Sequence, residues 1–261
     1  MPEEIRKYKD QLDGKAMLVR KAEVVPLEAI VRGYIVGGLF FFFPYSNVMT
    51  CIENFLGSAW SEYKKTGTVH SIPMPVGLLE GQKLAEPLFT PSTKAEQGVH
   101  DENISPEQGR LLFCCRPYLY QLPFFLAAKL IGQELYDKIS STSLRLYEEA
   151  ADYAKTRGVI LADTKFEFGL VPNGLKKDLI LIDELLTPDS SRYWPLEGYA
   201  PGKAQPSFDK QYVRDWLVNS GFQKGLENGP VGKEGQGWFI DEEVVKGTRE
   251  RYAEAVDLLT R

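Results

Sequence analysis

Residues 159–186 constrain the fold of this chain more than any other stretch. They hold two strand-like runs, VILADTKFEFGL and LILIDELL, joined through the polar link PNGLKKD. The Asn173–Gly174 pair in that link is a strong signal for a turn between antiparallel strands. The sequence therefore predicts a β-hairpin here, with a loop longer than two residues.

Alternation along the first run separates charged from apolar side chains, because successive residues of a strand point to opposite faces. Asp163, Lys165 and Glu167 share one face, and the Thr and Phe residues next to them are placed to enter a core. The second run ends in Asp183 and Glu184, which a hairpin brings near Lys165 and Glu167. Two carboxylates beside a lysine suit a Mg²⁺ ion that bridges nucleotide phosphates. The alternative is a solvated strand face whose salt bridges contribute less than about 1 kcal/mol each.

A turn rich in hydrogen-bond donors, TPDSSR at residues 187–192, follows the hairpin directly. Its two serine hydroxyls and the Arg192 guanidinium fit recognition of a phosphate or a carboxylate. A surface turn with an exposed arginine is the alternative. Further polar clusters occur at Arg32 in VRGY, at Ser58 in GSAWSEY and in FTPSTKAEQGVHDEN at residues 89–103.

The other segments indicate both helices and strands. Residues 16–36 are β-rich, and residues 57–106 have the Gly, Pro, Ser and Thr content of long ordered loops. The spacing of apolar residues predicts a helix over 141–157. A closing helix is expected from about 242 to 259, with a buried stripe formed by Val245, Thr248, Tyr252, Val256 and Leu259.

Composition excludes several classes of partner and site. The chain has 261 residues and a formal net charge of −5, so no basic surface favours nucleic acid or an anionic membrane. The charged N-terminal residues contain no signal-peptide core, and the longest apolar runs are too short or too interrupted to span a bilayer. The three cysteines have no metal-ligand spacing, and neither a Walker P-loop nor a GxSxG elbow occurs. These features predict a soluble, cytoplasmic protein.

Six long segments of the chain, in order, resemble the SAICAR synthetase family in its fungal or long form. They are LVRKAEVVPLEAIVRGYIVG, GSAWSEYKKTGTVH, EPLFTPSTKAEQGVHDENISPEQ, DYAKTRGVILADTKFEFGL, LILIDELLTPDSSRYW and SFDKQYVRDWL. Together they cover most of the chain outside two gaps. The resemblance implies an α+β fold, in which helices pack on the antiparallel sheet of an ATP-grasp-like nucleotide lobe. Residues 1–25 would be the remnant of a smaller N-terminal lobe, and residues 26–261 the catalytic domain.

The resemblance also implies the chemistry. Members of the family use ATP to join L-aspartate to the carboxylate of a carboxyaminoimidazole ribonucleotide in purine (IMP) biosynthesis, releasing ADP and phosphate. These small molecules, with Mg²⁺, are the expected ligands, and the sequence leaves the oligomeric state open. A carboxylate is a poor electrophile until phosphate makes its oxygen a leaving group, and cationic groups then stabilise the charge on the transferring phosphoryl.

Roles carry over from the family to individual positions. Glu167 and Asp183 resemble the magnesium–nucleotide carboxylates, and Lys165 lies between nucleotide and substrate, so these three form the expected catalytic set. Lys94 in STKAE resembles a phosphate-contacting lysine, and Glu28 a supporting polar residue.

The remaining expected positions bind ligands. Val24 and Val25 resemble an apolar hinge against adenine. The ribonucleotide- or aspartate-binding set comprises Arg32, Ser58, Asp101, Asp189, Arg192 and Arg214.

Three departures from the family pattern bear on activity. The sequence starts after the Gly-Lys-Val-Arg-Asp phosphate-binding segment of the family, so we expect part of the ATP cradle to be missing. Residues 38–56 and 109–126, rich in Phe, Leu and Cys, interrupt the pattern. We interpret both as translated introns, with hydrophobic loops that bind a partner as the alternative. A catalytically dead module that still holds the ribonucleotide is the rival function, and a kinase-like phosphotransferase is disfavoured because no HRD-like loop is present.

Overall fold

A computed structural model describes most of the chain outside three long segments. The described residues are 3–13, 16–36, 59–93, 131–203, 205–208, 212–213, 216–217, 220 and 240–261. The two segments interpreted as insertions, 38–56 and 109–126, lie outside them. Within the described ranges, no helix has the length and apolar character needed to cross a membrane.

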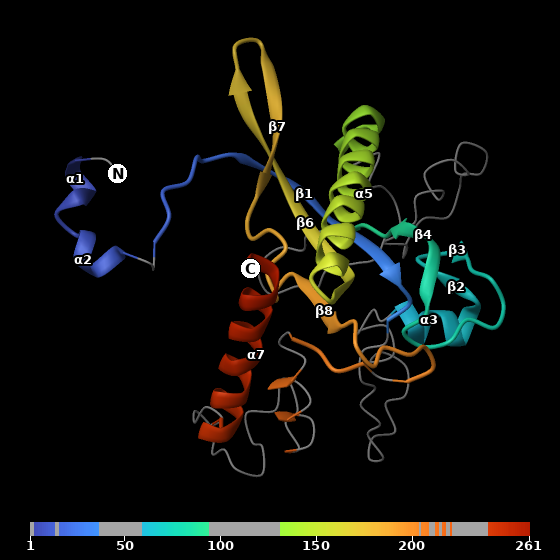
Figure 1. Cartoon of the computed structure of the whole chain (residues 1–261). Coiled ribbons are helices and arrows are strands. Elements are labelled where there is room, and N and C mark those ends of the chain that lie inside the picture. Colours follow the sequence, from blue (N-terminus) through green and yellow to red (C-terminus); the bar gives the residue numbers. More distant parts are fainter. Residues whose placement is uncertain are drawn as a thin grey trace, which may run out of the picture.

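An antiparallel sheet of six strands forms the centre of the fold (Figure 1). The strands β4 (Lys83–Phe89), β1 (Glu23–Tyr34), β6 (Val159–Asn173) and β7 (Lys176–Ile182) are neighbours in that order. The short strands β5 (Ser92–Thr93) and β8 (Ser191–Pro195) pair with β1 and β6, respectively. The long β1–β6 pair therefore joins residues that are more than a hundred positions apart in the sequence.

The predicted hairpin is confirmed as β6 and β7. Asn173 pairs with Lys176, so the turn consists of two residues, Gly174 and Leu175. Gly174 has a φ of 61°, a left-handed conformation that glycine adopts without steric cost. The expectation of a longer loop is wrong, because the polar residues after the turn stay in the ladder. Backbone hydrogen bonds hold this exposed end of the ribbon without any help from apolar side chains.

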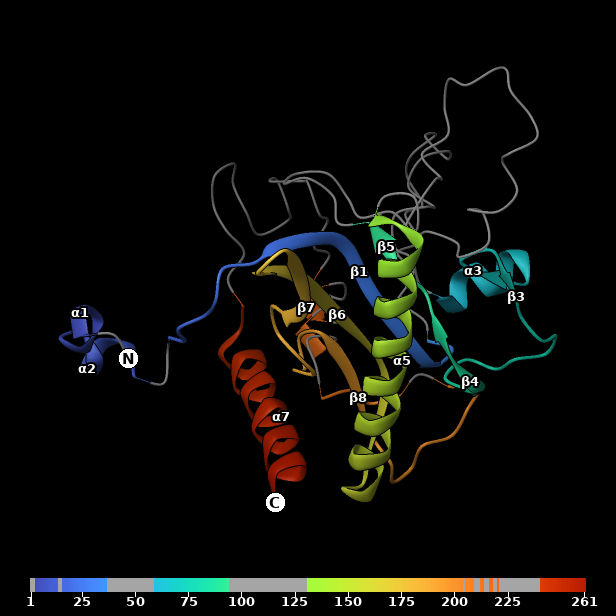
Figure 2. The same ribbon diagram turned by 90° about the horizontal axis from the view of Figure 1, so that it is seen from above.

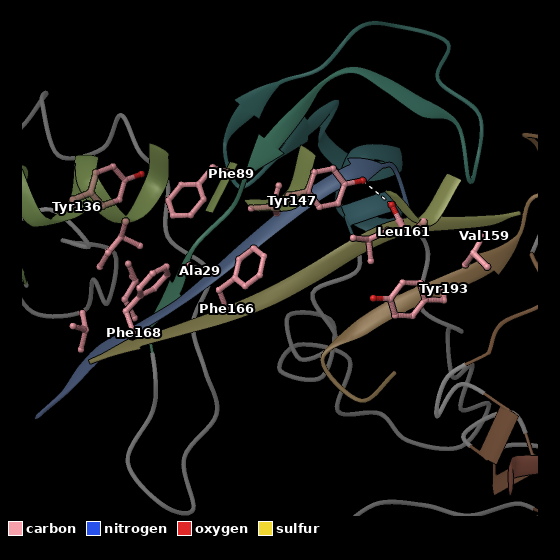
Figure 3. Close-up of a cluster of buried hydrophobic side chains, with 14 of the residues drawn as sticks. Ala29, Phe89, Tyr136, Tyr147, Val159, Leu161, Phe166, Phe168 and Tyr193 are labelled. Atoms are coloured by element: carbon pink, nitrogen blue, oxygen red, sulfur yellow. Dashed lines mark hydrogen bonds between the residues drawn. The ribbon is translucent and has the colours of Figure 1, made fainter. Parts of the chain in front are cut away.

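Helix α5 (Gln133–Thr156) covers one face of the sheet, as Figure 2 shows from above. Phe166 and Phe168 of β6 project to this side and are almost completely buried (Figure 3). The Tyr147 hydroxyl of α5 donates a hydrogen bond of 2.7 Å to the Leu161 carbonyl, and burial raises the pKa of Tyr147 far above its ordinary value. The helix begins earlier than the sequence predicted, because Tyr136 and Ile139 in its first turns also pack into the core.

Smaller elements complete the α+β class that the sequence predicted. Helix α3 (Ala59–Thr66) and the two-stranded sheet of β2 (Thr68–Val69) and β3 (Ile72–Pro73) form a second small cluster beside β4. Helices α1 (Glu3–Arg6) and α2 (Lys9–Leu12) lie apart from the sheet in both views (Figures 1 and 2).

Helix α7 (Glu242–Thr260) is the closing helix, but its buried stripe differs from the predicted one. Val244 and Ala255 are buried, whereas Val245 and Val256 are 54% and 56% exposed. Val244 and Ala255 each precede a predicted position by one residue. One residue corresponds to a rotation of about 100° around the helix axis. The predicted stripe is wrong at Val245 and Val256.

Candidate active site

Charged residues of β1 and β6 line the sheet face that does not pack against α5. Residues directly paired in an antiparallel ladder project to the same face. The register places Glu28 opposite Glu167, Ile30 opposite Lys165, and Arg32 opposite Asp163. The side chains between these positions belong to the core cluster under α5. The predicted alternation on β6 is therefore confirmed, and β1 adds a glutamate and an arginine to the same face.

The first group on this face, called here the Lys165 cluster, consists of Lys165, Glu28 and Glu167. The Lys165 Nζ donates hydrogen bonds of 2.9 Å to Glu28 Oε1 and 2.8 Å to Glu167 Oε1. Glu28 and Glu167 are 12% and 5% exposed in their side chains, and Lys165 is 28% exposed. Burial lowers the pKa of Lys165, but the hydrogen bonds and charges of the two glutamates outweigh it and raise that pKa above its ordinary value. The ammonium therefore stays protonated, and the cluster is net anionic.

The second group, the Asp163 cluster, consists of Asp163, Arg32 and Arg192. The Arg32 Nη1 donates a 3.1 Å hydrogen bond to Asp163 Oδ2, and its Nε donates to Thr90 Oγ1 at 3.0 Å. The Arg192 Nη1 lies 3.3 Å from the same carboxylate oxygen, in an ion pair. Burial lowers the pKa of Arg32, and the charge of Asp163 opposes that shift. One carboxylate thus faces two guanidiniums, and the cluster is net cationic.

Arg192 contacts Asp163 as an ion pair without hydrogen-bond geometry. The Nη1 of Arg192 is buried and has no partner with hydrogen-bond geometry within the described part of the chain. The structure therefore brings Arg192 beside Arg32 and Asp163, and the binding of a phosphate or carboxylate by Arg192 stays a prediction.

The turn between β7 and β8 is fixed to β6 by its backbone and hydroxyl groups. The Lys165 amide donates to the Ser190 carbonyl at 3.0 Å, and the Ser191 and Thr164 hydroxyls are 2.8 Å apart. Asp189 is exposed, and its Oδ1 accepts a 2.6 Å hydrogen bond from the Tyr252 hydroxyl of α7. The turn thus holds Asp189 and Arg192 at one edge of the charged face.

Asp183 lies one residue beyond the end of β7. Its neighbour Ile182 pairs with Glu167, so the chain brings Asp183 next to the Lys165 cluster. Asp183 is exposed and has a φ of 61°, a left-handed conformation that aspartate tolerates better than most residues. Both expected carboxylates therefore lie at one end of the charged face.

The two hinge valines occupy different environments. Val25 is 3% exposed and belongs to the core cluster, whereas Val24 is 49% exposed. Side chains alternate along β1, so one valine packs inside and the other faces outward. Of the two valines, Val24 is therefore the one whose apolar surface is exposed, and the hinge role stays a prediction. Four other expected residues, Lys94, Ser58, Asp101 and Arg214, lie outside the described residues.

Comparison with known proteins decides the family. The family profile described as SAICAR synthetase matches residues 3–228. This chain belongs to the SAICAR synthetase family. The phosphoribosylaminoimidazole-succinocarboxamide synthase of Maridesulfovibrio salexigens is 45% identical over 259 residues, which cover 99% of this chain and 70% of that protein. The enzyme of the same name from Pichia angusta is 45% identical over 262 residues, covering 100% of this chain and 70% of that protein.

Solved structures agree with this family. A structure described as SAICAR synthase from Saccharomyces cerevisiae complexed with SAICAR matches with a TM-score of 0.71 and 39% identity, covering 100% of this chain and 69% of that one. A SAICAR synthetase described as a complex with ADP has a TM-score of 0.52 and 23% identity, covering 93% of this chain and 66% of that one, and it shows the same fold.

The residues of this SAICAR synthetase family member fit a nucleotide-bound Mg²⁺ ion better than a free-standing metal site. Among the residues that the structure describes, no group of three or more His, Cys, Asp or Glu side chains is arranged to hold a metal. Glu167 and Asp183 supply hard oxygen donors from adjacent strands. Protein sites commonly hold Mg²⁺ through one or two carboxylates together with substrate phosphates. The donor set therefore fits Mg²⁺ that arrives with a nucleotide.

Asp163 and Thr90 were missed as site residues by sequence reasoning. The alternation on β6 placed Asp163 on the charged face but gave it no role, and nothing in the local sequence indicated that Thr90 contacts Arg32. Asp163 contacts two of the three expected substrate-binding arginines, Arg32 and Arg192, and lies 131 residues from Arg32 along the chain. A signal for Asp163 existed in its alternation with Lys165, whereas Thr90 required the β1–β4 pairing to be known.

Proposed function

We infer that this chain is an ATP-dependent carbon–nitrogen ligase with the activity of its family. It joins L-aspartate to the carboxylate of 5-amino-1-(5-phosphoribosyl)imidazole-4-carboxylate and gives SAICAR, ADP and phosphate, a step of purine biosynthesis. The observation that carries this conclusion is the 45% identity to phosphoribosylaminoimidazole-succinocarboxamide synthases over essentially the whole chain. The two charge clusters side by side on one sheet face supply the groups that this reaction requires.

The cationic Asp163 cluster supports a role in holding the ribonucleotide. Arg32 and Arg192 present guanidinium groups fixed by one shared carboxylate. Guanidinium binds phosphate and carboxylate oxygens through paired hydrogen bonds, which orient the ligand as well as attract it. Ser58, Asp101, Asp189 and Arg214 complete the proposed ribonucleotide- and aspartate-binding set.

The Lys165 cluster supports a role at the phosphoryl group. With its pKa raised by Glu28 and Glu167, Lys165 is an ammonium at neutral pH. It is therefore suited to stabilise negative charge on the transferring phosphoryl, and unsuited to accept the proton that the aspartate amine loses. Glu167 and Asp183 would hold Mg²⁺ on the nucleotide phosphates, where the ion neutralises charge. Lys94 would contact the phosphates, and Val24 with the backbone of Val25 would line the adenine.

Substrates of this kind also support a cytoplasmic location, because phosphorylated nucleotides carry several charges and do not cross a bilayer unaided. The rival proposal is a module that holds the ribonucleotide without using ATP. The exposure of Met17, Leu18 and Val19, at 83%, 68% and 72%, favours this rival. Within the described residues these apolar side chains, which precede Val24 and Val25 in the sequence, stay largely uncovered.

A coupled measurement of ADP and succinocarboxamide tests the proposal. The purified chain is incubated with the ribonucleotide, L-aspartate and Mg-ATP, and both products are followed. We expect equal amounts of the two, and loss of both in Glu167→Gln. Binding of the ribonucleotide without either product, in a chain shown to be folded by circular dichroism, would establish the rival. Absence of both binding and turnover in the folded chain would overturn the assignment.

A further inference from the structure

Helix α7 lies outside the stretch that the family profile matches, since that match ends at residue 228. Of its 19 residues only Val244 and Ala255 are buried. A helix held chiefly by core packing would bury a broader apolar stripe. Leu258 and Leu259 pack partly against the same core, and polar and aromatic contacts join the helix to α5, to the turn before β8 and to Tyr212 and Trp216.

The first contact joins α7 to the turn between β7 and β8. The Tyr252 hydroxyl donates a 2.6 Å hydrogen bond to Asp189 Oδ1, across 63 residues of sequence. The backbone of this turn is already fixed, since the Tyr193 hydroxyl binds the Leu186 carbonyl at 2.8 Å and Lys165 binds Ser190. The hydrogen bond from Tyr252 therefore acts on the direction of the Asp189 carboxylate rather than on the path of the turn.

The second contact joins α7 to residues on either side of Arg214. The Arg251 guanidinium lies over the Tyr212 ring, 3.7 Å from its centroid, and the Trp216 indole N–H donates to Asp241 Oδ2 at 3.2 Å. Gly247 lets Tyr212 approach the helix, because a Cβ there would lie 2.9 Å from the Tyr212 hydroxyl and 3.0 Å from its ring. A glycine inside a helix disfavours the helix, so its presence at the contact is explained by this close approach.

We propose that α7 is a positioning element of the substrate site, acting through Tyr252 on Asp189 while Gly247 and Arg251 hold the helix against Tyr212. The inference rests on the proposed function, because Asp189 belongs to the substrate-binding set suggested there. Tyr252 touches no reacting atom in this arrangement. It fixes the orientation of a carboxylate that accepts hydrogen bonds from hydroxyl or amine groups of a substrate.

The chain provides a matched control for Tyr252. The hydroxyl of Tyr153 in α5 donates a 2.8 Å hydrogen bond to the Leu259 carbonyl, so it also ties α7 to the body of the protein. Tyr153→Phe deletes a hydroxyl of α5 that binds α7. Tyr252→Phe deletes a hydroxyl of α7 that binds the turn before β8. Only the second deletion removes a hydrogen bond to a proposed site residue.

Steady-state kinetics of the full chain separate positioning from stability. For Tyr252→Phe we expect KM for L-aspartate or the ribonucleotide to rise roughly threefold to tenfold, the scale of one ordinary hydrogen bond because this one is solvent-exposed, with kcat and KM for ATP within about twofold. Tyr153→Phe should leave all three constants unchanged while its melting temperature falls as much as that of Tyr252→Phe. Gly247→Ala, which favours the helix intrinsically, should nevertheless raise the same KM. Equal constants for Tyr252→Phe and Tyr153→Phe in an active chain would overturn the proposal.

Amide hydrogen exchange, measured without substrate, tests the role of α7 independently of the proposed function. Amides of residues 186–192 should exchange several-fold faster in Tyr252→Phe than in Tyr153→Phe, and those around Tyr212 faster in Gly247→Ala. If the exchange differs as expected but the wild-type chain forms no product, the contact is supported and the proposed function fails. If wild-type turnover is normal and exchange in these segments is unchanged, the positioning role fails alone.

Discussion

The Lys165 and Asp163 clusters use the same strands and the same face but have opposite composition. In the Lys165 cluster one cation lies between two carboxylates, and its ammonium is 28% exposed. In the Asp163 cluster one carboxylate lies between two cations, and Arg32 and Asp163 are only 7% and 11% exposed in their side chains. A shift of two residues along β6 therefore changes the sign of the field and the exposure of the central ion, from 28% for Lys165 to 11% for Asp163.

This difference predicts that one cluster contributes mainly to stability and the other mainly to catalysis. Buried ion pairs depend strongly on every partner, since removal of one leaves an uncompensated charge in a poorly solvated place. A more open lysine loses less when its partner is changed, and it remains accessible to a ligand. The Asp163 cluster is therefore expected to contribute more to folding, and the Lys165 cluster more to the rate of the reaction.

Replacement of Asp163, the central carboxylate of the Asp163 cluster, should cause the largest loss of stability. Asp163→Ala leaves Arg32 and Arg192 facing each other without a counter-charge, and we expect a loss of about 3 to 5 kcal/mol in the free energy of unfolding. Urea denaturation followed by circular dichroism measures this change. Glu149→Gln is the control, because it removes an Arg145–Glu149 pair whose side chains are 67% and 65% exposed and should cost less than about 0.5 kcal/mol. Similar losses in the two variants would contradict the assigned difference in burial.

Replacement of the central cation should act on rate instead. Lys165→Met is expected to lower kcat about 100-fold to 1,000-fold, the scale seen when one preorganised charge that stabilises a transition state is removed. The accompanying loss of stability should be smaller than that of Asp163→Ala. Lys177→Met on the same hairpin serves as the control, because Lys177 pairs with Glu23 where both side chains are more than half exposed. A Lys165→Met enzyme with normal kcat would remove Lys165 from the catalytic set.

The raised pKa of Lys165 makes stability depend on pH in the alkaline range. A cation whose pKa is higher in the folded state contributes stability that is complete below the unfolded pKa, about 10.4, and is lost as pH rises through the folded value. Buried Tyr136 and Tyr193 act in the same direction, because burial raises the pKa of each to about 12 and the folded state keeps their protons longer. We expect unfolding free energy to fall between pH 10 and pH 12, measured by urea denaturation at each pH. A profile that stays flat over this interval would contradict these shifts.

The features that the sequence predicted correctly follow from local covalent geometry. Alternation placed Asp163, Lys165 and Glu167 on one face because the period of two is a property of any strand. Their partners on β1 depend on register, and no local signal indicated that Arg32 would pair with Asp163. The buried stripe of α7 was misplaced for a related reason. Periodicity gives the spacing of a stripe, whereas the rotation of the helix is set by contacts with Tyr212 and the core.

The smallest expected effect concerns the outer carboxylate of the Lys165 cluster. Glu28→Gln keeps a hydrogen-bond acceptor for Lys165 and leaves Glu167 as its remaining charged partner, at 2.8 Å. We expect kcat to fall about twofold to fivefold and unfolding free energy to change by less than about 1 kcal/mol, as for a neutral replacement of a partly solvated partner. Glu167→Gln keeps the same shape but removes a proposed ligand of nucleotide-bound Mg²⁺, so it should cost far more activity. Equal losses in the two variants would mean that both glutamates act only by holding Lys165, and that neither contributes a metal ligand.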